Sequence, residues 1–358
     1  MELVRVLLLL LLTACVCVAS GLCACPWGSC GAWAGVVAAA ALMFSALWTR
    51  AWREEETLPC TGRAVLITGC DSGFGHALAL RLSGLGLQVF AGVLDSEGTG
   101  AKKLKEQDPE RITILQMDVT NAEHIAQVKE AIKKQLGEKG LWGLVNNAGL
   151  LLCPVDAELQ STSTVRRIME VNFLSAVTVT QAFLPLIRRA KGRVVSVSSL
   201  AGAVPLPRFS AYSSSKAALS SFCRVLRLEM IQWGVHVALI QPSGFKTKIF
   251  GSSEDLSRYR QELLSHTPPE VLQDYGQDYI SNLPSSLDTM SQNAMQDVSP
   301  VLDCIGHALL STRPRELYCP GNAAWLLPFL YTHLPTTVFD RIILKFNSDT
   351  CHPSALQN

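Results

Sequence analysis

The sequence predicts an α/β domain built on a doubly wound, mostly parallel sheet. From residue 63 onward, short apolar runs alternate with helix-length stretches, and such alternation implies right-handed crossovers between parallel strands. A glycine-rich loop lies directly between the first apolar run and the first helical pattern, where folds of this class bind phosphate groups. The chain has 358 residues and is 48% apolar, which is enough for one large domain.

The predicted elements follow one another in a regular order. Six apolar runs are expected to be strands: Ala64 to Thr68, Leu87 to Leu94, Ile112 to Met117, Leu141 to Val145, Arg193 to Val197 and Val235 to Ile240. Four stretches have a helical pattern: His76 to Leu85, Ala122 to Leu136, Thr164 to Arg189 and Tyr212 to Trp233. A polar, proline-containing stretch at about 245–300 predicts short helices that cap one edge of the sheet and shape a substrate pocket.

The amino end predicts a membrane anchor over residues 1–52. Val6 to Ala24 and Gly31 to Trp48 carry no charge, and each is about long enough to span a bilayer core. The first run alone is also compatible with a cleaved secretory signal, but a second apolar run so soon afterwards favours retention in the membrane. Residues 53–62 are polar and proline-containing, so we interpret them as a linker.

Charges on either side of the two spans predict the orientation. Arg5 precedes the first span, and Arg50 and Arg53 follow the second, which places both flanks in the cytosol by the positive-inside rule. Scattered cysteines and the absence of any Asn-x-Ser/Thr sequon suit a cytosolic main domain. The sequence has no metal-ligand spacing, and a net charge of +1 argues against nucleic-acid binding.

The carboxyl end, residues 322–358, combines an apolar segment with a tail. Ala323 to Leu334 is rich in aromatic and aliphatic side chains but is too short to span a bilayer. This segment is either part of the core or a patch that contacts the bilayer surface, and the sequence leaves both interpretations open.

The glycine loop predicts a dinucleotide site. Residues 69–75 have glycine in a GxxxGxG spacing, which lets the backbone approach a pyrophosphate at a helix amino terminus. Asp95 ends the second strand and is expected to bind the adenosine ribose of NAD and to repel the additional phosphate of NADP. The alternative for Asp95 is a helix N-cap. Asp118, at the end of the third strand, is expected near the adenine.

A tyrosine, a lysine and a serine predict proton-transfer chemistry. Tyr212 and Lys216 are four residues apart and share one face of a helix, so the ammonium group can stabilise a phenolate and lower the tyrosine pKa. Ser199 follows the fifth strand, and strand ends of this kind line clefts. Asn172 lies within an apolar helical stretch, where its amide needs a partner. Taken alone, the Tyr212 and Lys216 spacing is also compatible with a surface pair.

Together these motifs resemble those of the short-chain dehydrogenase/reductase family, over roughly Arg63 to Gly321. The resemblance implies a Rossmann-type fold, with Tyr212 transferring the proton, Ser199 holding the substrate oxygen, Lys216 lowering the tyrosine pKa and binding the nicotinamide ribose, and Asn172 supporting a proton relay. It implies cofactor contacts from Gly69, Asp71, Ser72, Gly73, Phe74, Gly75, Asp95, Asp118, Val119, Asn146, Ala148, Gly149 and Lys216. Pro242-Ser243-Gly244 departs from the family pattern, in which glycine directly follows proline, and this weakens the carry-over of Thr247.

A finer resemblance is to the membrane-bound hydroxysteroid and retinol dehydrogenases of this family. It is carried by the segments 141–149, 233–235 and 274–280 and by the two-span amino end. It implies NAD-dependent oxidation of a hydroxysteroid, foremost at the 17β-hydroxyl (estradiol to estrone, testosterone to androstenedione), by a homodimer in the endoplasmic reticulum membrane. Oxidation of an 11β-hydroxysteroid or of retinol, and a catalytically silent NAD-binding scaffold, are the alternatives.

Overall fold

The computed structural model describes residues 56–346 and 352–356. The predicted anchor and its two spans, 6–24 and 31–48, lie outside these residues. The described chain forms a parallel sheet of seven strands in the order β3-β2-β1-β4-β5-β6-β7, which confirms the Rossmann-type prediction. The strands are β1 (Ala64–Thr68), β2 (Gln88–Val93), β3 (Ile112–Gln116), β4 (Gly143–Asn146), β5 (Arg193–Val197), β6 (His236–Ile240) and β7 (Leu317–Tyr318).

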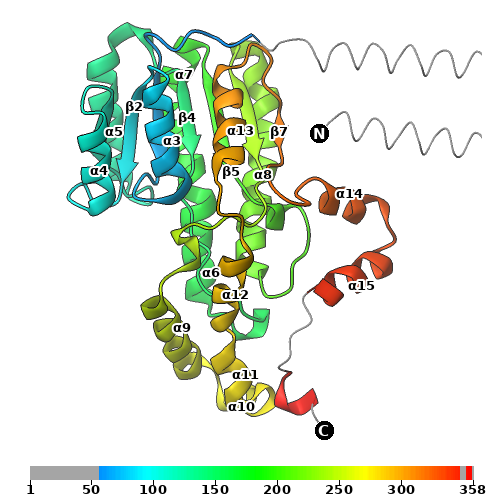
Figure 1. The fold of residues 1–358 in the computed structure, drawn as a ribbon. Helices are drawn as coiled ribbons and strands as arrows, with labels where there is room; N and C mark the ends of the chain where they lie inside the picture. Colours follow the sequence, from blue (N-terminus) through cyan, green and yellow to red (C-terminus); the bar gives the residue numbers. More distant parts are fainter. Residues whose placement is uncertain (1–55, 347–351, 357–358) are drawn as a thin grey trace, which may run out of the picture. The chain divides into compact units, whose positions relative to one another are not determined.

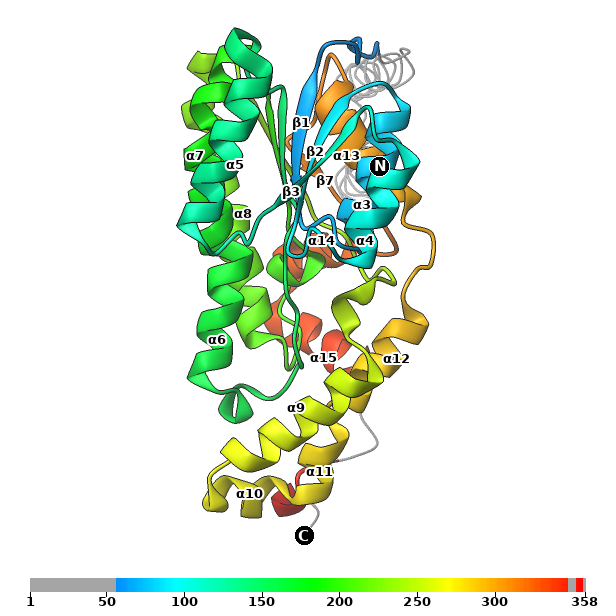
Figure 2. The same ribbon diagram turned by 90° about the vertical axis from the view of Figure 1, so that its left-hand side faces the viewer.

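Helices cover both faces of the sheet, as Figures 1 and 2 show. One face carries α3 (Gly73–Gly84), α4 (Thr99–Gln107) and α13 (Ser299–Leu310), and the other carries α5 (Ala122–Leu136), α7 (Ser175–Ala190) and α8 (Ser210–Met230). The central strands are therefore buried on both sides, and all five residues of β1 and of β5 are buried. This double burial explains why these strands are continuous apolar runs in the sequence.

The long helix predicted over Thr164 to Arg189 consists of three pieces. It begins as α6 (Thr162–Met169), passes through a π-helical turn at Glu170–Leu174 and continues as α7. The whole stretch, Thr162–Ala190, is long and apolar enough to cross a membrane, and 44% of its most apolar window is buried inside the protein. Its contacts with the sheet and with α8 identify it as a core helix of the domain.

The residues after Phe245 form a group of helices beyond the carboxyl ends of the strands (Figure 1). They are α9 (Ser253–His266), α10 (Pro269–Tyr275), α11 (Gln277–Asn282) and α12 (Ser285–Asn293). The hydroxyl group of Tyr279 donates to the Asp156 carboxylate at 2.7 Å, and that of Tyr275 donates to Glu158 at 3.1 Å. These two bonds attach α10 and α11 to the loop that follows β4.

Two helices near the carboxyl end, α14 (Leu326–His333) and α15 (Thr336–Phe346), pack beside the loop that follows β5. Leu327 and Leu330 of α14 contact a buried cluster that is formed by Val204, Phe339 and Ile343. Other apolar side chains of the pair are exposed, among them Leu326 at 36%, Tyr331 at 43% and Leu344 at 60%. The apolar segment therefore contributes to the core on one side, while its contact with a bilayer stays a prediction.

Candidate active site

A large cavity lies at the carboxyl ends of the strands, where open α/β sheets bind their ligands. Its volume is about 1310 Å³, which exceeds the range of roughly 300–1,000 Å³ that is usual for one small ligand. The glycine loop and the segments after β3, β4, β5 and β6 line it, and α8 and the helices beyond Phe245 complete it. The cavity is therefore large enough for a dinucleotide together with a second molecule.

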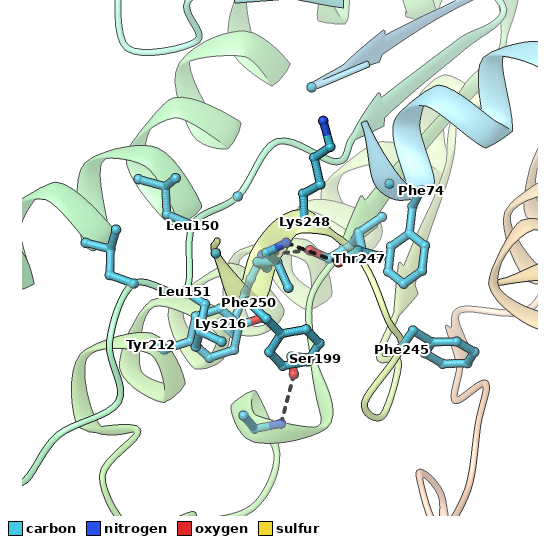
Figure 3. A pocket seen from close by; sticks show the side chains of 18 of the residues that line it. Phe74, Leu150, Leu151, Ser199, Tyr212, Lys216, Phe245, Thr247, Lys248 and Phe250 are labelled. Atoms are coloured by element: carbon cyan, nitrogen blue, oxygen red, sulfur yellow. Dashed lines mark hydrogen bonds between the residues drawn. The ribbon is translucent and has the colours of Figure 1, made fainter. Parts of the chain in front are cut away.

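The predicted serine, tyrosine and lysine all line this cavity (Figure 3). Tyr212 and Lys216 lie in the first turns of α8, and the Lys216 ammonium is 5.8 Å from the centre of the tyrosine ring. Lys216 Nζ also donates to the Val197 carbonyl oxygen at 3.0 Å, which holds it at the end of β5. The Ser199 hydroxyl accepts a hydrogen bond from Ala201 N at 3.2 Å and lies within hydrogen-bond reach of Tyr212.

Burial dominates the acid–base properties of this group. It raises the pKa of Tyr212 to about 12, and the hydrogen bond with Ser199 opposes only part of that rise. Burial also lowers the pKa of Lys216 to about 8, because an ammonium group loses more hydration than an amine does. The direction for the Tyr212 pKa is opposite to the lowering expected from the sequence, because the desolvation of the phenolate outweighs the hydrogen bond with Ser199.

Asn172 does not line the cavity but lies directly beneath it. Its side chain accepts a hydrogen bond from Leu150 N at 2.7 Å and donates to Leu150 O at 2.8 Å and to Ser215 Oγ at 3.0 Å. The π-helical turn turns this side chain inward, and turns of this kind are frequent at functional sites. A methyl group added at Gly149 would lie 3.3 Å from both Asn172 Oδ1 and Lys216 Nζ, so the amide and the ammonium lie close together.

The glycine loop forms the far wall of the cavity, which Gly69, Asp71, Ser72, Gly73 and Phe74 line. Gly73 has a φ of +60°, which side chains rarely adopt, and it begins α3. Ser72 is the N-cap residue of α3, but its side chain makes no capping hydrogen bond. The first N–H groups of α3 therefore remain available to an anion.

Gly75 has a packing role instead and does not line the cavity. A side chain here would collide with the Gly69 carbonyl oxygen and with the Asn147 amide. Asn147 itself donates through Nδ2 to Thr68 O at 2.9 Å and to Gly69 O at 3.1 Å, which fixes the glycine loop to the end of β4. Sequence reasoning did not select Asn147, although it lies within the segment 146–149, whose other three residues were assigned to the cofactor.

Asn146, which the resemblance assigned to the cofactor, lies away from the cavity. It is 5% exposed, and its Nδ2 donates to Thr180 Oγ1 at 2.9 Å and to Ser196 Oγ at 3.3 Å. The side chain thus connects β4 to α7 and β5. The three residues that follow it, Asn147, Ala148 and Gly149, do line the cavity.

The carboxylates near the second strand have different environments. Asp71 accepts hydrogen bonds from Leu94 N at 2.9 Å and Asp95 N at 3.3 Å, so it holds the end of β2 against the glycine loop. Asp95 is exposed, accepts from Glu97 N at 2.9 Å and is not among the residues that line the cavity, although Leu94 is. Because α4 has Gly98 as its N-cap, Asp95 is not the N-cap of that helix.

Asp118 and Val119 line the cavity after β3, as predicted. The Asp118 carboxylate accepts hydrogen bonds from the backbone N–H of Thr120 at 2.9 Å and from its hydroxyl at 2.7 Å. These bonds stabilise the charged form and hold the Asp118 pKa below its ordinary value. Asp118 is therefore an ionised acceptor at neutral pH.

The wall opposite the glycine loop is apolar. Leu151 belongs to a buried cluster that packs against Phe250, Tyr259 and the ring of Tyr212, and half of its buried members come from the region beyond Phe245. Leu152 and Arg208, with φ of +57° and +70°, also line this part of the cavity in a conformation that is strained for non-glycine residues. No sequence signal predicted these two strained positions.

Ser243, at which the chain departs from the family pattern, lies at the edge of the sheet. Its backbone N–H donates to Pro320 O at 3.1 Å, next to β7, and a side chain at Gly321 would collide with its hydroxyl. The chain then returns to the cavity, where Thr247 lies 3.3 Å from the position that a methyl group on Gly73 would take. Thr247 therefore lies against the glycine loop despite the departure from the family pattern.

Within the described residues, no group of three or more histidine, cysteine or carboxylate side chains is arranged to hold a metal ion. The site instead offers N–H groups and an ionised acceptor for a dinucleotide. It also offers a phenol, a hydroxyl and an ammonium group beside an apolar wall.

Comparison with known proteins agrees with this geometry. Residues 63–256 match the family model described as short chain dehydrogenase. The chain is 44% identical over 292 residues to mouse estradiol 17-beta-dehydrogenase 2, which covers 82% of this chain and 77% of that protein. It is 43% identical over 300 residues to human 11-beta-hydroxysteroid dehydrogenase type 2, which covers 84% of this chain and 74% of that protein.

Solved structures give the same result for the fold. A short-chain dehydrogenase from Streptomyces avermitilis superposes with a TM-score of 0.62 and 25% identity, over 80% of this chain and 96% of that one. The chain therefore belongs to the short-chain dehydrogenase family of oxidoreductases, whose fold binds NAD or NADP.

Proposed function

We propose that this protein oxidises a hydroxysteroid to a ketosteroid with NAD, foremost at a 17β-hydroxyl group. The observation that carries the proposal is the joint position of Ser199, Tyr212 and Lys216 between a phosphate-binding loop and an apolar wall. The names of the relatives support a steroid as the substrate class. The similarity to an 11-beta-hydroxysteroid dehydrogenase makes the 11β-hydroxyl group the second candidate.

The proposed chemistry needs one base and one anchor for the alcohol. The Ser199 hydroxyl donates to the substrate oxygen and orients it toward Tyr212, which accepts the hydroxyl proton as general base. The Lys216 ammonium lies 5.8 Å from the centre of the tyrosine ring and stabilises the phenolate form of Tyr212, which is the form that can accept this proton. When NAD is bound, its nicotinamide ring supplies the acceptor for the hydride.

Asn172 is a positioning residue in this proposal. Its hydrogen bonds to both backbone groups of Leu150 fix the segment after β4, and its amide lies close to Lys216. This arrangement fixes the position of the cavity wall relative to the Lys216 ammonium group, and the predicted proton relay requires such a fixed position. Its role is therefore exerted through Leu150 and Lys216 and not through contact with the substrate.

The residues of the cavity fit a dinucleotide. The open amino terminus of α3 would hold the pyrophosphate, Asp118 and Val119 the adenine, and Ala148 and Gly149 the ribose next to Lys216. We propose NAD in preference to NADP because residues 94–98 contain two acids, Asp95 and Glu97, and no base that would bind a ribose phosphate. Exposure of Asp95 leaves its second carboxylate oxygen accessible to a ribose.

We also propose an anchor in the endoplasmic reticulum membrane with the catalytic domain in the cytosol. The two uncharged runs in residues 1–52 and their flanking arginines support this assignment, and so does an apolar substrate that concentrates in bilayers. The proposed domain comprises residues 63–321, with the linker at 53–62 and the substrate cap at 245–300. A homodimer is supported by exposed apolar side chains on α8, Val225 at 53% and Leu228 at 60%.

A substrate panel on isolated membranes tests the proposal. Estradiol, testosterone, cortisol and retinol are each offered with NAD or NADP to the wild type, to Tyr212→Phe and to Tyr331→Phe, which alters an exposed tyrosine in α14. We expect steroid oxidation with NAD, a loss of more than about 100-fold in Tyr212→Phe and none in Tyr331→Phe. Full activity in Tyr212→Phe would exclude the mechanism, and inactivity of the wild type on all four compounds would favour a silent scaffold.

Two further measurements test the cofactor preference and the orientation of the catalytic domain. Asp95→Ala should narrow the preference for NAD, and a preference for NADP in the wild type would overturn the role of Asp95. Protease treatment of sealed microsomes should digest the catalytic domain. Protection of the domain in intact vesicles would contradict its cytosolic orientation.

A further inference from the structure

Lys248 is a basic residue of the cavity to which the proposed mechanism gives no role. It begins a short 3-10 turn, Lys248–Phe250, in the loop after β6, and it lines the cavity. Figure 3 shows its side chain extending away from Ser199 and Tyr212. It is exposed and makes no ion pair with the described residues. The ammonium group is therefore available to a ligand.

The base of this loop is fixed to the first turn of α3. Phe245 is 3% exposed, and its ring packs edge-to-face on Phe74 at a centroid distance of 5.7 Å. Backbone hydrogen bonds from Lys246 N to Met295 O at 2.8 Å and from Met295 N to Gly244 O at 3.0 Å hold the other side of the loop. Lys248 thus follows a segment that is held in place against the glycine loop.

Contact between Thr247 and the glycine loop brings Lys248 to the amino terminus of α3. The Thr247 side chain lies 3.3 Å from the position of a methyl group on Gly73, the first residue of that helix. Two carboxylates, those of Asp71 and Asp118, line the same half of the cavity. Their negative charges repel an anion there, so a nearby ammonium group would offset this repulsion and favour the binding of an anion.

Two other basic residues of the cavity already have partners. The Lys216 ammonium is bonded to the Val197 carbonyl at the catalytic end, and Arg258 pairs with Asp255. We propose that Lys248 binds the pyrophosphate of the dinucleotide cofactor, across the groove from Gly73. This inference rests on the proposed use of a dinucleotide and adds a residue from the loop after β6 to its binding site.

The contact has two measurable properties. A pyrophosphate is common to NAD, NADH and ADP-ribose, so a cation that binds it affects all three alike. An exposed charge pair weakens as salt is added, because its attraction is screened over about 10 Å at 0.1 M ionic strength. The effect of losing Lys248 should therefore shrink at high salt.

The test is an equilibrium titration of the full chain in detergent with NADH, followed by fluorescence, and competition with ADP-ribose. The variants are Lys248→Gln, Lys248→Arg and, as a matched control, Lys246→Gln, which alters an exposed lysine of the same loop that does not line the cavity. We expect Lys248→Gln to weaken both ligands about fivefold to tenfold at low salt and less at 0.5 M salt. Lys248→Arg and Lys246→Gln should bind within about twofold of the wild type.

Equal binding by Lys248→Gln and Lys246→Gln would overturn the inference. Weaker binding of NADH with unchanged binding of ADP-ribose would also overturn it, because the ammonium would then act on the nicotinamide end. If the wild type binds no dinucleotide, the proposed function itself fails. That result is distinct from normal NADH binding that is insensitive to Lys248.

Discussion

Replacing Lys216 by methionine tests a buried charge that the proposed chemistry requires. The Lys216 side chain is 4% exposed, and burial lowers its pKa from 10.5 to about 8. Each pKa unit corresponds to about 1.4 kcal/mol, so the folded chain carries the ammonium near neutral pH at a cost of about 3 kcal/mol. Methionine has a similar length and no charge, so the variant removes this cost.

The lowered pKa fixes the sign of a pH dependence. Between about pH 8 and pH 10.5 the unfolded chain binds more protons at Lys216 than the folded chain does, so stability rises with pH in this window. We expect the free energy of unfolding of the wild type to increase by about 2 kcal/mol from pH 7 to pH 10 through this group. The pKa of Tyr212 is raised to about 12, so its opposite contribution lies above about pH 10.

Urea unfolding of the full chain in detergent, at several pH values between 7 and 10, measures this difference. The increase should be absent in Lys216→Met and present in Lys103→Met, which alters an exposed lysine of α4. At pH 7, Lys216→Met should be at least as stable as the wild type, because removing the charge-burial cost of about 3 kcal/mol offsets the about 1–3 kcal/mol that the unpaired Val197 carbonyl costs. If the free energy of unfolding changed with pH in the same way for the wild type and for Lys216→Met, the argument would be refuted.

Three further variants test the frame around the site. Asn172→Ala leaves both backbone groups of Leu150 without their partner, and we expect a loss of about 2–4 kcal/mol in urea unfolding; a loss below that of Ser215→Ala would contradict this. Gly276→Ala introduces a methyl group where Ser354 lies, so hydrogen exchange at residues 352–356 should accelerate, and unchanged exchange would rule out the contact. Tyr279→Phe removes a bond to Asp156 and should raise the substrate KM without changing kcat, whereas an equal fall of kcat would indicate a different role.

The parallel sheet and its central strands could be predicted from the sequence because these strands are buried on both faces. Ala64–Thr68 and Arg193–Val197 match the prediction residue for residue. The strand β7 could not be predicted, because Leu317–Tyr318 has only two residues and pairs with β6 through contacts that are distant in the sequence.

Side-chain direction limited the prediction of the site. Asn146 and Asn147 are adjacent, and successive side chains along a strand point to opposite faces. Because both residues are asparagine, the sequence alone did not indicate which side chain approaches the glycine loop. The pairing of Tyr212 with Lys216 followed from helical spacing, whereas the raised pKa of Tyr212 depends on the surrounding apolar cluster. That cluster joins the segment after β4 to helices beyond Phe245, and the arrangement of these helices has no short sequence motif.

The long helix Thr162–Ala190 has a consequence for how the orientation of this protein can be mapped. Reporter fusions that end shortly after residue 190 would lack β5 and α8, and with them the surfaces that bury Val179, Phe183 and Ile187. A translocon would then meet an apolar stretch long enough to cross a bilayer, and the reporter would score a span that the complete chain does not use. Orientation should therefore be mapped with glycosylation sites or single cysteines introduced into the full-length chain.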